Sequence, residues 1–549
     1  TRPLVLYTSS NDGFLHAFKV ASGDPKTETT PEQQVTIKTQ NELWAFIPPA
    51  VLTGLQTQYP GSHQVLLDGV PVIKDVVASP ANVALFERDA DSARFGASLW
   101  RTVLVQAFGG TRGGYFALDI TDPVISGGTG GPRFLWQLTT DSDGNPLFGD
   151  GGGTPLITTV FLEDKEVAVA VLPGGEGTRD DGADPVDRQA VSTFVDPDYT
   201  PRSEVPAYSG TAARSLTVVR LDNGQIIRTF RNDADEVSDL DSSVVIETGI
   251  DSPITGTPVA YPSEVGAIAD RVFVGDQEGA LWRLDLSESD PDEWTMTLFY
   301  DAFPEQTANG ALAYEAADGQ PIATRPIISV DGENRLVVLF STGDQESMFA
   351  SEGTDNFIVS LTEVFDAEDS SFRSKVNWYK LFEDGKRVTG PMVLFSSQLY
   401  AATFEGAPPT SVCGGGKSSV WAMDFLERAT PTDPSSGGEP LWEINNTLVQ
   451  ERPVLDDTGA ETVVFGLTLT QEPSCLDTDL EALGEDPFIA FGAHTQLRGL
   501  NPGKFKLIMH TGGLNSGDVT ADAAGNTQEI ELEAPSSVTR IDSWASIVE

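Results

Sequence analysis

Short apolar runs of strand length recur along the whole chain, separated by polar turns rich in glycine, asparagine and aspartate. The runs alternate apolar and polar residues or are rich in β-branched residues, and both patterns are typical of β-strands. Three successive runs form a unit, in which a glycine-containing or small polar turn joins the first two strands and the third strand carries Trp or Phe. Seven copies occur, and their second strands are predicted at 14–20, 115–120, 215–224, 280–287, 357–361, 418–425 and 494–503.

This unit, with a further strand expected upstream, is the pattern of a propeller blade. We therefore predict an all-β fold, a modified seven-bladed β-propeller of the quinoprotein-like kind, with long inserted loops. The third strands of the last two copies are predicted at 440–444 and 503–509. The units recur at irregular intervals of about 60 to 100 residues, whereas a bare blade takes roughly 40 to 50. The surplus is expected in surface loops rather than in the core, and the largest of these is 174–214.

The repeat also accounts for conspicuous acidic residues at turns. Residues 11–13, Asn-Asp-Gly, lie between two strand runs and tolerate the positive φ that tight hairpins need, so we predict a hairpin rather than a metal or cofactor site. Asp119, Asp222, Asp285 and Asp424 end the second strand in four copies. Because they recur at equivalent positions, they are predicted to be turn residues rather than catalytic carboxylates.

Composition narrows the class of partner. The chain has 82 acidic and 34 basic residues, a net charge of −48 and a pI near 4.2. Such a surface repels a phosphate backbone, so nucleic acid is not expected as a partner. No run of 18 apolar residues occurs, so no membrane span is predicted. No change in composition marks a boundary, and residues 1–549 are therefore predicted to form a single domain with loop insertions.

The two cysteines, Cys413 and Cys475, lie in turn-rich segments of the last third. In an acidic, glycine-rich all-β chain such a pair favours an oxidising compartment and one disulfide. The bridge would close a loop of about 60 residues and stabilise the fold by roughly 4 kcal/mol. Two free buried thiols are the alternative. Because the chain opens at Thr1 without a signal peptide, we interpret it as a processed chain or a fragment.

Several motifs, taken in order, resemble the C-terminal β-propeller of the PilY family of type IV pilus biogenesis and tip-adhesin proteins. The resemblance covers nearly the whole chain, and the matching segments include NDGFLHAF (11–18), ELWAFIPPAVL (42–52), DGVPVIKDV (68–76), WRTVLVQAFGGTRGGYFALDITDP (100–123), ADRVFVGDQEGALWRLDLS (269–287), CGGGKSSVWAMDF (413–425) and RIDSW (540–544).

This resemblance implies a non-enzymatic protein of the cell exterior, exported through the periplasm and placed at the pilus tip. It implies work with minor pilins, by protein–protein contact, in pilus assembly, surface adhesion and twitching motility. The adhesion target, on a host or an abiotic surface, is not implied. The family also has a separate N-terminal region, often von Willebrand A-like, whose DxSxS motif is absent from this sequence.

For part of the family the resemblance implies a calcium loop with oxygen ligands on alternate residues. The aligned stretch here is 262–270, where Pro262 and Gly266 stand at two ligand positions and only Glu264 and Asp270 offer carboxylates. The loop is therefore a degenerate form of the calcium site.

A second acidic loop, at 139–152, is the alternative calcium site. It places Asp141, Asp143 and Asn145 on alternate residues and is followed by Asp150. Its glycine is displaced from the position that an EF-hand requires. Asp-Gly-Asn is also ordinary turn chemistry, and a plain turn is the competing interpretation.

No enzyme motif is evident. The four histidines do not pair at metal-ligand spacing, no G-x-S-x-G elbow occurs, and 414–418 lacks the first glycine of a P-loop. Two alternatives stay open: a secreted propeller that binds glycans or matrix, and a dehydrogenase dependent on pyrroloquinoline quinone (PQQ), although the PilY resemblance implies no PQQ. Loops on a rigid scaffold carry recognition, so the inserts at 141–153 and 174–214 are the predicted contact surfaces.

Overall fold

The computed structural model describes most of the chain. The described residues are 3–21, 41–58, 65–78, 86–89, 99–110, 112–125, 130–188, 199–232, 244–264, 266–307, 312–345, 353–367, 370–406, 416–426, 449–454, 463–471, 505–512 and 527–532. The chain divides into two compact units, each described by itself. The first comprises Thr1–Asp344, Asp355–Leu381 and Thr432–Pro440, and the second Gln345–Thr354, Phe382–Pro431 and Leu441–Glu549.

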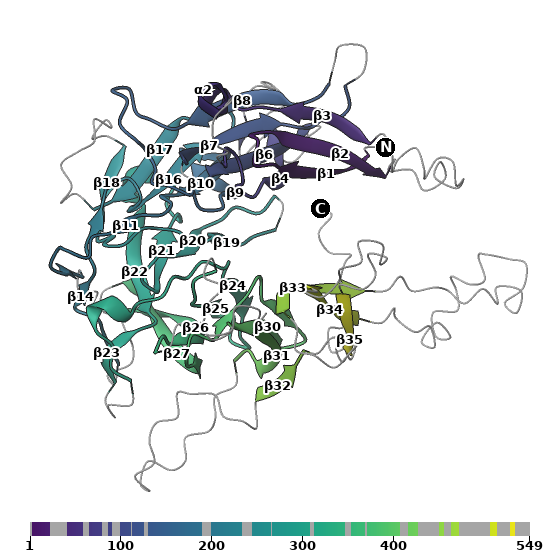
Figure 1. The fold of residues 1–549 in the computed structure, drawn as a ribbon. Coiled ribbons are helices and arrows are strands. Elements are labelled where there is room, and N and C mark those ends of the chain that lie inside the picture. Colours follow the sequence, from purple (N-terminus) through teal and green to yellow (C-terminus); the bar gives the residue numbers. More distant parts are fainter. Residues whose placement is uncertain are drawn as a thin grey trace, which may run out of the picture. The chain divides into compact units, whose positions relative to one another are not determined.

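Five sheets follow one another along the first unit (Figure 1). The first sheet contains β1 (Leu4–Ser9), β2 (Leu15–Ala21) and β3 (Glu42–Phe46), and the second contains β4 (Val72–Ala78), β6 (Leu99–Gly109), β7 (Arg112–Asp119) and β8 (Arg133–Leu138). The third contains β5 (Glu87–Asp89), β9 (Leu156–Leu162), β10 (Lys165–Pro173), β16 (Ser215–Arg220), β17 (Ile226–Arg231) and β18 (Val245–Glu247), which pairs in parallel with β17. The fourth contains β19 (Val259–Tyr261), β20 (Arg271–Gly275), β21 (Ala280–Asp285) and β22 (Thr295–Asp301), and the fifth β24 (Ile327–Val330), β25 (Leu336–Ser341), β26 (Asn356–Asp366) and β27 (Ser371–Phe382).

The second unit adds two sheets. One contains β28 (Arg387–Val388), β29 (Val393–Phe395), β30 (Gln398–Glu405), β31 (Lys417–Asp424) and β32 (Val449–Pro453), and the other β33 (Val463–Gln471), β34 (Phe505–Gly512) and β35 (Thr527–Leu532). With the five sheets of the first unit, the described residues form seven blade-type sheets in chain order, which confirms the predicted all-β, seven-bladed propeller. The prediction of a single domain over 1–549 stays a prediction.

The last two sheets differ in detail from the sequence pattern. The outer strand that pairs with β31 is β32, which begins nine residues after the predicted start at 440, and the predicted strand at 440–444 lies outside the described residues. In the seventh sheet β34 pairs directly with β33, so the run at 503–509 supplies a middle strand rather than an outer one. The outer strand is β35, which the sequence analysis missed. The predicted strand at 494–503 lies outside the part of the chain that the structure describes.

Continuous apolar runs occur where a strand is covered on both faces. In β10 the side chains of Val167, Val169 and Val171 pack into a core cluster shared with the fourth sheet, whereas Ala168, Ala170 and Leu172 pack into a cluster shared with the second sheet. Because successive side chains of a strand point to opposite faces, this burial requires an unbroken apolar sequence. Each fully buried valine contributes about 1.5–3 kcal/mol.

Two tryptophans of the third strands bind the next sheet by hydrogen bonds. Trp44 Nε1 in β3 donates to the carbonyl of Pro123 at 2.9 Å, and Trp136 Nε1 in β8 donates to that of Leu221 at 2.9 Å. Both indoles are buried. These two tryptophans therefore connect consecutive sheets, whereas Trp294 Nε1 donates to the Glu288 carbonyl in the connection between β21 and β22 at 2.8 Å.

The helical elements among the described residues are short: α2 (Pro49–Gln58) and two 3-10 turns, Pro291–Glu293 and Ala316–Asp318. The sequence analysis did not predict α2, whose first turn is capped by Gln137, since its Oε1 accepts the Ala50 N–H at 2.9 Å. Within the described chain, no helix has the length and apolar character needed to cross a membrane.

The turns behave as predicted. Gly13 has φ of +97° and its N–H donates to the carbonyl of Ser10 at 2.9 Å, which confirms the opening hairpin. The carboxylates of Asp119, Asp285 and Asp424 each accept the N–H two residues ahead, at 2.9 to 3.0 Å. The copy that carries Asp222 differs, because the Gly224 N–H donates to the Arg220 carbonyl at 2.9 Å and Asn223 Oδ1 accepts the Gln225 N–H at 2.8 Å.

Candidate functional site

The insertion at 174–214 is folded onto the first unit. It contains β11 (Thr178–Arg179), β12 (Val186–Asp187), β13 (Tyr199–Pro201), β14 (Glu204–Val205) and β15 (Tyr208–Ser209). β11 pairs with β15, β12 with β14, and β13 with β23 (Pro304–Thr307). Arg188, Tyr199, Arg202, Val205 and Tyr208 are buried. The prediction of a surface loop is therefore wrong for these residues, because the arginines of this polar segment find carboxylates in the sheets.

Arg188 lies inside a buried cluster of charges. Its Nε and Nη2 donate to the two carboxylate oxygens of Asp251 at 3.0 and 3.2 Å. Its Nη1 lies 2.8 Å from Asp301 Oδ2, and its Nη2 lies 3.6 Å from Asp276 Oδ2. The side chain of Arg188 is 1% exposed and those of its three partners are at most 3% exposed. Its charge is therefore matched by protein groups and not by solvent.

Arg202 is the second cation of the cluster. Its Nε and Nη2 form a fork on Asp301 at 3.1 and 3.0 Å, and its Nη2 also donates to the Glu278 carbonyl. Its Nη1 donates to the Ala316 carbonyl at 3.3 Å and lies 3.6 Å from Glu278 Oε2. The Tyr208 hydroxyl of β15 donates to Glu278 Oε1. Arg202 and Tyr208 thus tie the insertion to the fourth sheet and to the turns at its strand ends.

Asp276 follows β20 directly and organises the turn into β21. Its Oδ1 accepts the N–H groups of Glu278 and Ala280 at 2.9 and 2.8 Å, and its Oδ2 accepts Trp282 Nε1 at 3.0 Å. These bonds fix the carboxylate where Arg188 approaches it.

Burial dominates the electrostatics of two of these acids. It raises the pKa of Asp276 to about 6 and that of Glu278 to about 7. Burial alone would also raise the pKa of Asp301, but the guanidinium groups of Arg202 and Arg188 hold it below its ordinary value. Removing one partner of such a buried pair costs about 3–5 kcal/mol, so the cluster fixes the insertion firmly.

The two inserts predicted as contact surfaces meet in the structure. Gly149 N–H donates to the Gly174 carbonyl at 2.7 Å, and Glu176 N–H donates to the Asp150 carbonyl at 2.7 Å. Between them lies an open groove of about 450 Å³, here called the insert groove. Its lining includes Arg112, Thr139, Thr140, Asp150, Glu176, Thr178 and Ser209.

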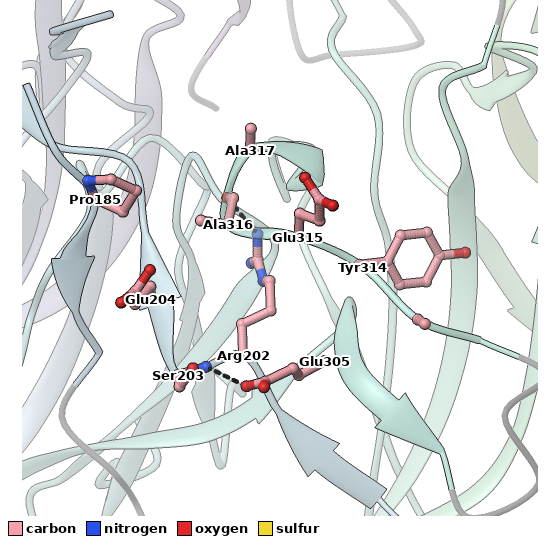
Figure 2. Close-up of a pocket in the computed structure, with 10 residues that line it drawn as sticks. Pro185, Arg202, Ser203, Glu204, Glu305, Tyr314, Glu315, Ala316 and Ala317 are labelled. Carbon is pink, nitrogen blue, oxygen red and sulfur yellow. Dashed lines mark hydrogen bonds between the residues drawn. The ribbon is translucent and has the colours of Figure 1, made fainter. Parts of the chain in front are cut away.

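A second hollow of about 600 Å³ is lined in part by Ser203 and Glu204, and we call it the acidic hollow. Figure 2 shows Glu204, Glu305 and Glu315 around it, with Arg202 reaching the Ala316 carbonyl. The Ser203 N–H donates to Glu305 at 3.1 Å. All three glutamates are exposed, so the hollow presents negative charge to solvent.

The predicted calcium residues Glu264 and Asp270 have cationic neighbours. Both oxygens of Asp270 accept from Arg271, at 2.7 and 3.2 Å. Lys74 Nζ donates to the Ser263 carbonyl at 3.3 Å, and its charge interacts with that of Glu264. Because these cations lie beside its carboxylates, the loop at 262–270 is a poor fit to a calcium ion.

In the loop at 139–152, Asp141 closes a turn. Its Oδ1 accepts the N–H groups of Asp143 and Asn145 at 3.0 and 2.8 Å, and its Oδ2 accepts Asn145 Nδ2 at 3.1 Å. These bonds lower the pKa of Asp141, although burial alone would raise it. Asp150 is exposed and forms a β-bridge with Glu176. Calcium in this loop stays a prediction.

Across the described residues, His, Cys, Asp and Glu side chains form no group of three that fits a metal ion. The predicted disulfide cannot be placed, because Cys413 and Cys475 lie outside these residues.

Sequence reasoning missed the charge cluster. Its acids come from strand ends and turns 50 residues apart, and its arginines lie in a segment without periodicity. The available signal was local: aspartate ends the runs VFVGD and TLFYD, and the chain has only 34 basic residues to pair with 82 acidic ones.

Comparisons with known proteins find PilY1 proteins among the relatives of this chain. The type IV pilus biogenesis factor PilY1 of Pseudomonas aeruginosa (strain UCBPP-PA14) is 28% identical over 62% of this chain and 23% of its own length. A PilY1 homolog of Xylella fastidiosa is 22% identical over 72% of this chain and 22% of its own length. The matches thus span less than a quarter of these relatives. No family model matches the chain.

Solved structures resemble the chain more distantly. The C-terminal domain of P. aeruginosa PilY1 has a TM-score of 0.46 at 17% identity, covering 86% of this chain and 89% of that one. A europium-containing methanol dehydrogenase has a TM-score of 0.33 at 11% identity, covering 92% and 71%. Both scores lie below 0.5, so neither likeness bears on function. On the sequence matches and the ordered motifs, the chain is similar to the β-propeller of the PilY family.

Proposed function

We propose that this chain works in type IV pilus biogenesis as a non-enzymatic propeller that acts by protein–protein contact. The observation that carries the proposal is the 28% identity to a type IV pilus biogenesis factor over 62% of the chain. The proposal extends to a place at the pilus tip on the cell exterior and to roles in adhesion and twitching motility. Minor pilins are the proposed partners, and no PQQ takes part.

The contact surface that we propose is the insert groove together with the acidic hollow. Both are lined by the insertion, which the cluster of Arg188 and Arg202 fixes to the sheets. A rigid scaffold with recognition in its loops suits a protein that binds other proteins. The exposed glutamates of the acidic hollow favour a partner surface with basic residues.

The first test is labelling of intact source cells with a gold-conjugated antibody against this chain, viewed by electron microscopy. We expect label at filament tips. Label that is released into the medium without filaments would contradict the tip assignment and would favour the secreted glycan- or matrix-binding propeller. A quinone absorbance in the purified protein would contradict the non-enzymatic proposal and favour the dehydrogenase.

A second test addresses the contact surface. Asp150→Arg reverses an exposed charge in the insert groove, and Glu333→Arg reverses one on another exposed loop, where the side chain is 73% exposed. In a strain lacking the native gene, we expect fewer surface pili and less twitching with Asp150→Arg than with Glu333→Arg. Equal complementation by both variants would remove the insert groove as the contact surface.

A further inference from the structure

The buried cluster is unbalanced in charge. Its members are two cations, Arg188 and Arg202, and four carboxylates, Asp251, Asp276, Glu278 and Asp301. Fully ionised, it would hold two excess negative charges away from solvent, which is costly. Asp251 and Asp301 each accept two guanidinium hydrogen bonds. Asp276 and Glu278 only approach a guanidinium at 3.6 Å, so the imbalance falls on these two groups.

Glu278 is the more weakly compensated of the two. Its Oε1 accepts from Tyr208, but its Oε2 is buried without a hydrogen-bond partner. The charged and titratable groups that face it are Tyr208, Arg202, Asp276 and Arg179. Those that face Asp276 are Arg188, Asp251, Glu278 and Tyr208. The cations among these described neighbours are Arg188, Arg202 and Arg179, and Arg179 is 35% exposed, so loss of both protons leaves buried negative charge that the two buried guanidinium groups do not neutralise.

The cluster joins two parts of the first unit. Both arginines and Tyr208 belong to the insertion, whereas the four acids follow or end β18, β20 and β22. The insertion in turn lines the insert groove through Glu176, Thr178 and Ser209, and the acidic hollow through Glu204. A change in the charge of the cluster therefore acts on the segment that shapes both hollows.

We propose that the cluster is a pH-sensitive clasp, which holds the insertion closed in mildly acidic surroundings and loosens it as the pH rises through neutrality. This proposal rests on the proposed function, since it concerns regulation of the same contact surface. With Asp276 and Glu278 protonated, two cations meet two anions and the cluster is neutral. With both ionised, the excess charge pushes the insertion toward an open, hydrated state.

The direction follows from proton linkage. Burial raises the pKa of Glu278 from 4.5 to about 7 and that of Asp276 from 3.8 to about 6, so the closed state binds more protons than the open one. The stabilisation is complete below their ordinary pKa values and is lost as the pH rises through 6 and 7. Asp301 acts oppositely, because its lowered pKa makes the clasp fail in stronger acid.

The test is hydrogen–deuterium exchange of the whole chain, read by mass spectrometry at peptides within 199–209 and corrected for the intrinsic pH dependence of exchange. For Glu278 alone, opening is expected to be about tenfold more frequent at pH 8 than at pH 6. Peptides from β26 and β27, in the same unit, should show no comparable change. An insertion that opens equally at both pH values would overturn the proposal.

Two variants sharpen the test. Glu278→Gln keeps an acceptor for Tyr208 but does not titrate, so the change between pH 6 and 8 should fall to about twofold, the share of Asp276. Glu305→Gln alters an exposed carboxylate that accepts the Ser203 N–H, and should keep the full change. A Glu278→Gln profile identical to the unaltered protein would also overturn the clasp. If Glu278→Gln does not fold, the pH dependence of exchange in Asp276→Asn, compared with that in the unaltered protein, tests the proposal instead.

The proposal of a clasp and the proposal of a contact function can be refuted independently of each other. Exchange is measured on the isolated chain, so a clasp that titrates as expected stands even if Asp150→Arg leaves piliation intact. Conversely, a contact surface confirmed by complementation stands even if exchange shows no pH dependence.

Discussion

Loss of Arg188 is the sharpest perturbation that the structure offers. Arg188→Met removes the guanidinium that donates twice to Asp251 and lies 2.8 Å from Asp301, and it leaves an unbranched apolar side chain of roughly similar volume. The carboxylates stay buried with one cation fewer. Breaking a buried pair in this way costs about 3–5 kcal/mol, and we expect the free energy of unfolding of the first unit to fall by that amount.

The matched control is Arg179→Met in the same insertion. Arg179 is 35% exposed and its acidic partner Asp181, 3.9 Å away, is 91% exposed, so the ion pair is worth about 0–1 kcal/mol. Urea denaturation followed by tryptophan fluorescence measures both variants. Hydrogen–deuterium exchange at 199–209 shows whether the loss of stability begins in the insertion.

The pH dependence of Arg188→Met separates charge from packing. Without the guanidinium the neighbouring carboxyl groups hold their protons more tightly, so the variant should be less destabilised at pH 5.5 than at pH 8. A deficit that equals that of Arg179→Met, or one that does not change with pH, would refute the reasoning. The buried arginine would then act through its volume alone.

Three further predictions test the fold and the calcium expectation. Trp136→Phe leaves the buried Leu221 carbonyl without its donor and should lower the free energy of unfolding by about 1–3 kcal/mol. Trp100 is 48% exposed, so Trp100→Phe should change the free energy of unfolding little. Urea denaturation compares the two variants, and equal effects would contradict a structural role for the indole hydrogen bond. Gly279 and Gly210 both have φ near +85°, but only at Gly279 would an added Cβ meet the Phe303 ring, at 2.5 Å. Gly279→Ala should therefore lower the melting temperature more than Gly210→Ala does. The reverse order would be incompatible with that contact. The melting temperature should be the same in millimolar calcium as in EDTA, because protein donors already engage Asp141 and Asp270. Calcium bound at 100 times its Kd would instead add about 2.7 kcal/mol to the free energy of unfolding.

The sequence by itself determined the repeating part of this protein. Apolar runs of strand length such as β10 and turn residues such as Gly13 and Asp285 depend on only a few neighbouring residues, so their pattern can be recognised without a structure. Those local rules yielded seven blade units and the turn roles of Asp119, Asp285 and Asp424. They failed at the seventh sheet, where β35 has a short polar sequence with little to mark it.

Tertiary structure alone decided what the insertion does. The ion pairs of Arg188 with Asp251 and of Arg202 with Asp301 join residues 63 and 99 positions apart, and nothing in the intervening sequence encodes the approach. The same holds for the insert groove, which exists because Gly149 and Gly174 meet at 2.7 Å. A polar, acidic segment is indistinguishable from a surface loop until its few arginines find buried carboxylates, because long-range charge pairing leaves no periodic trace in sequence.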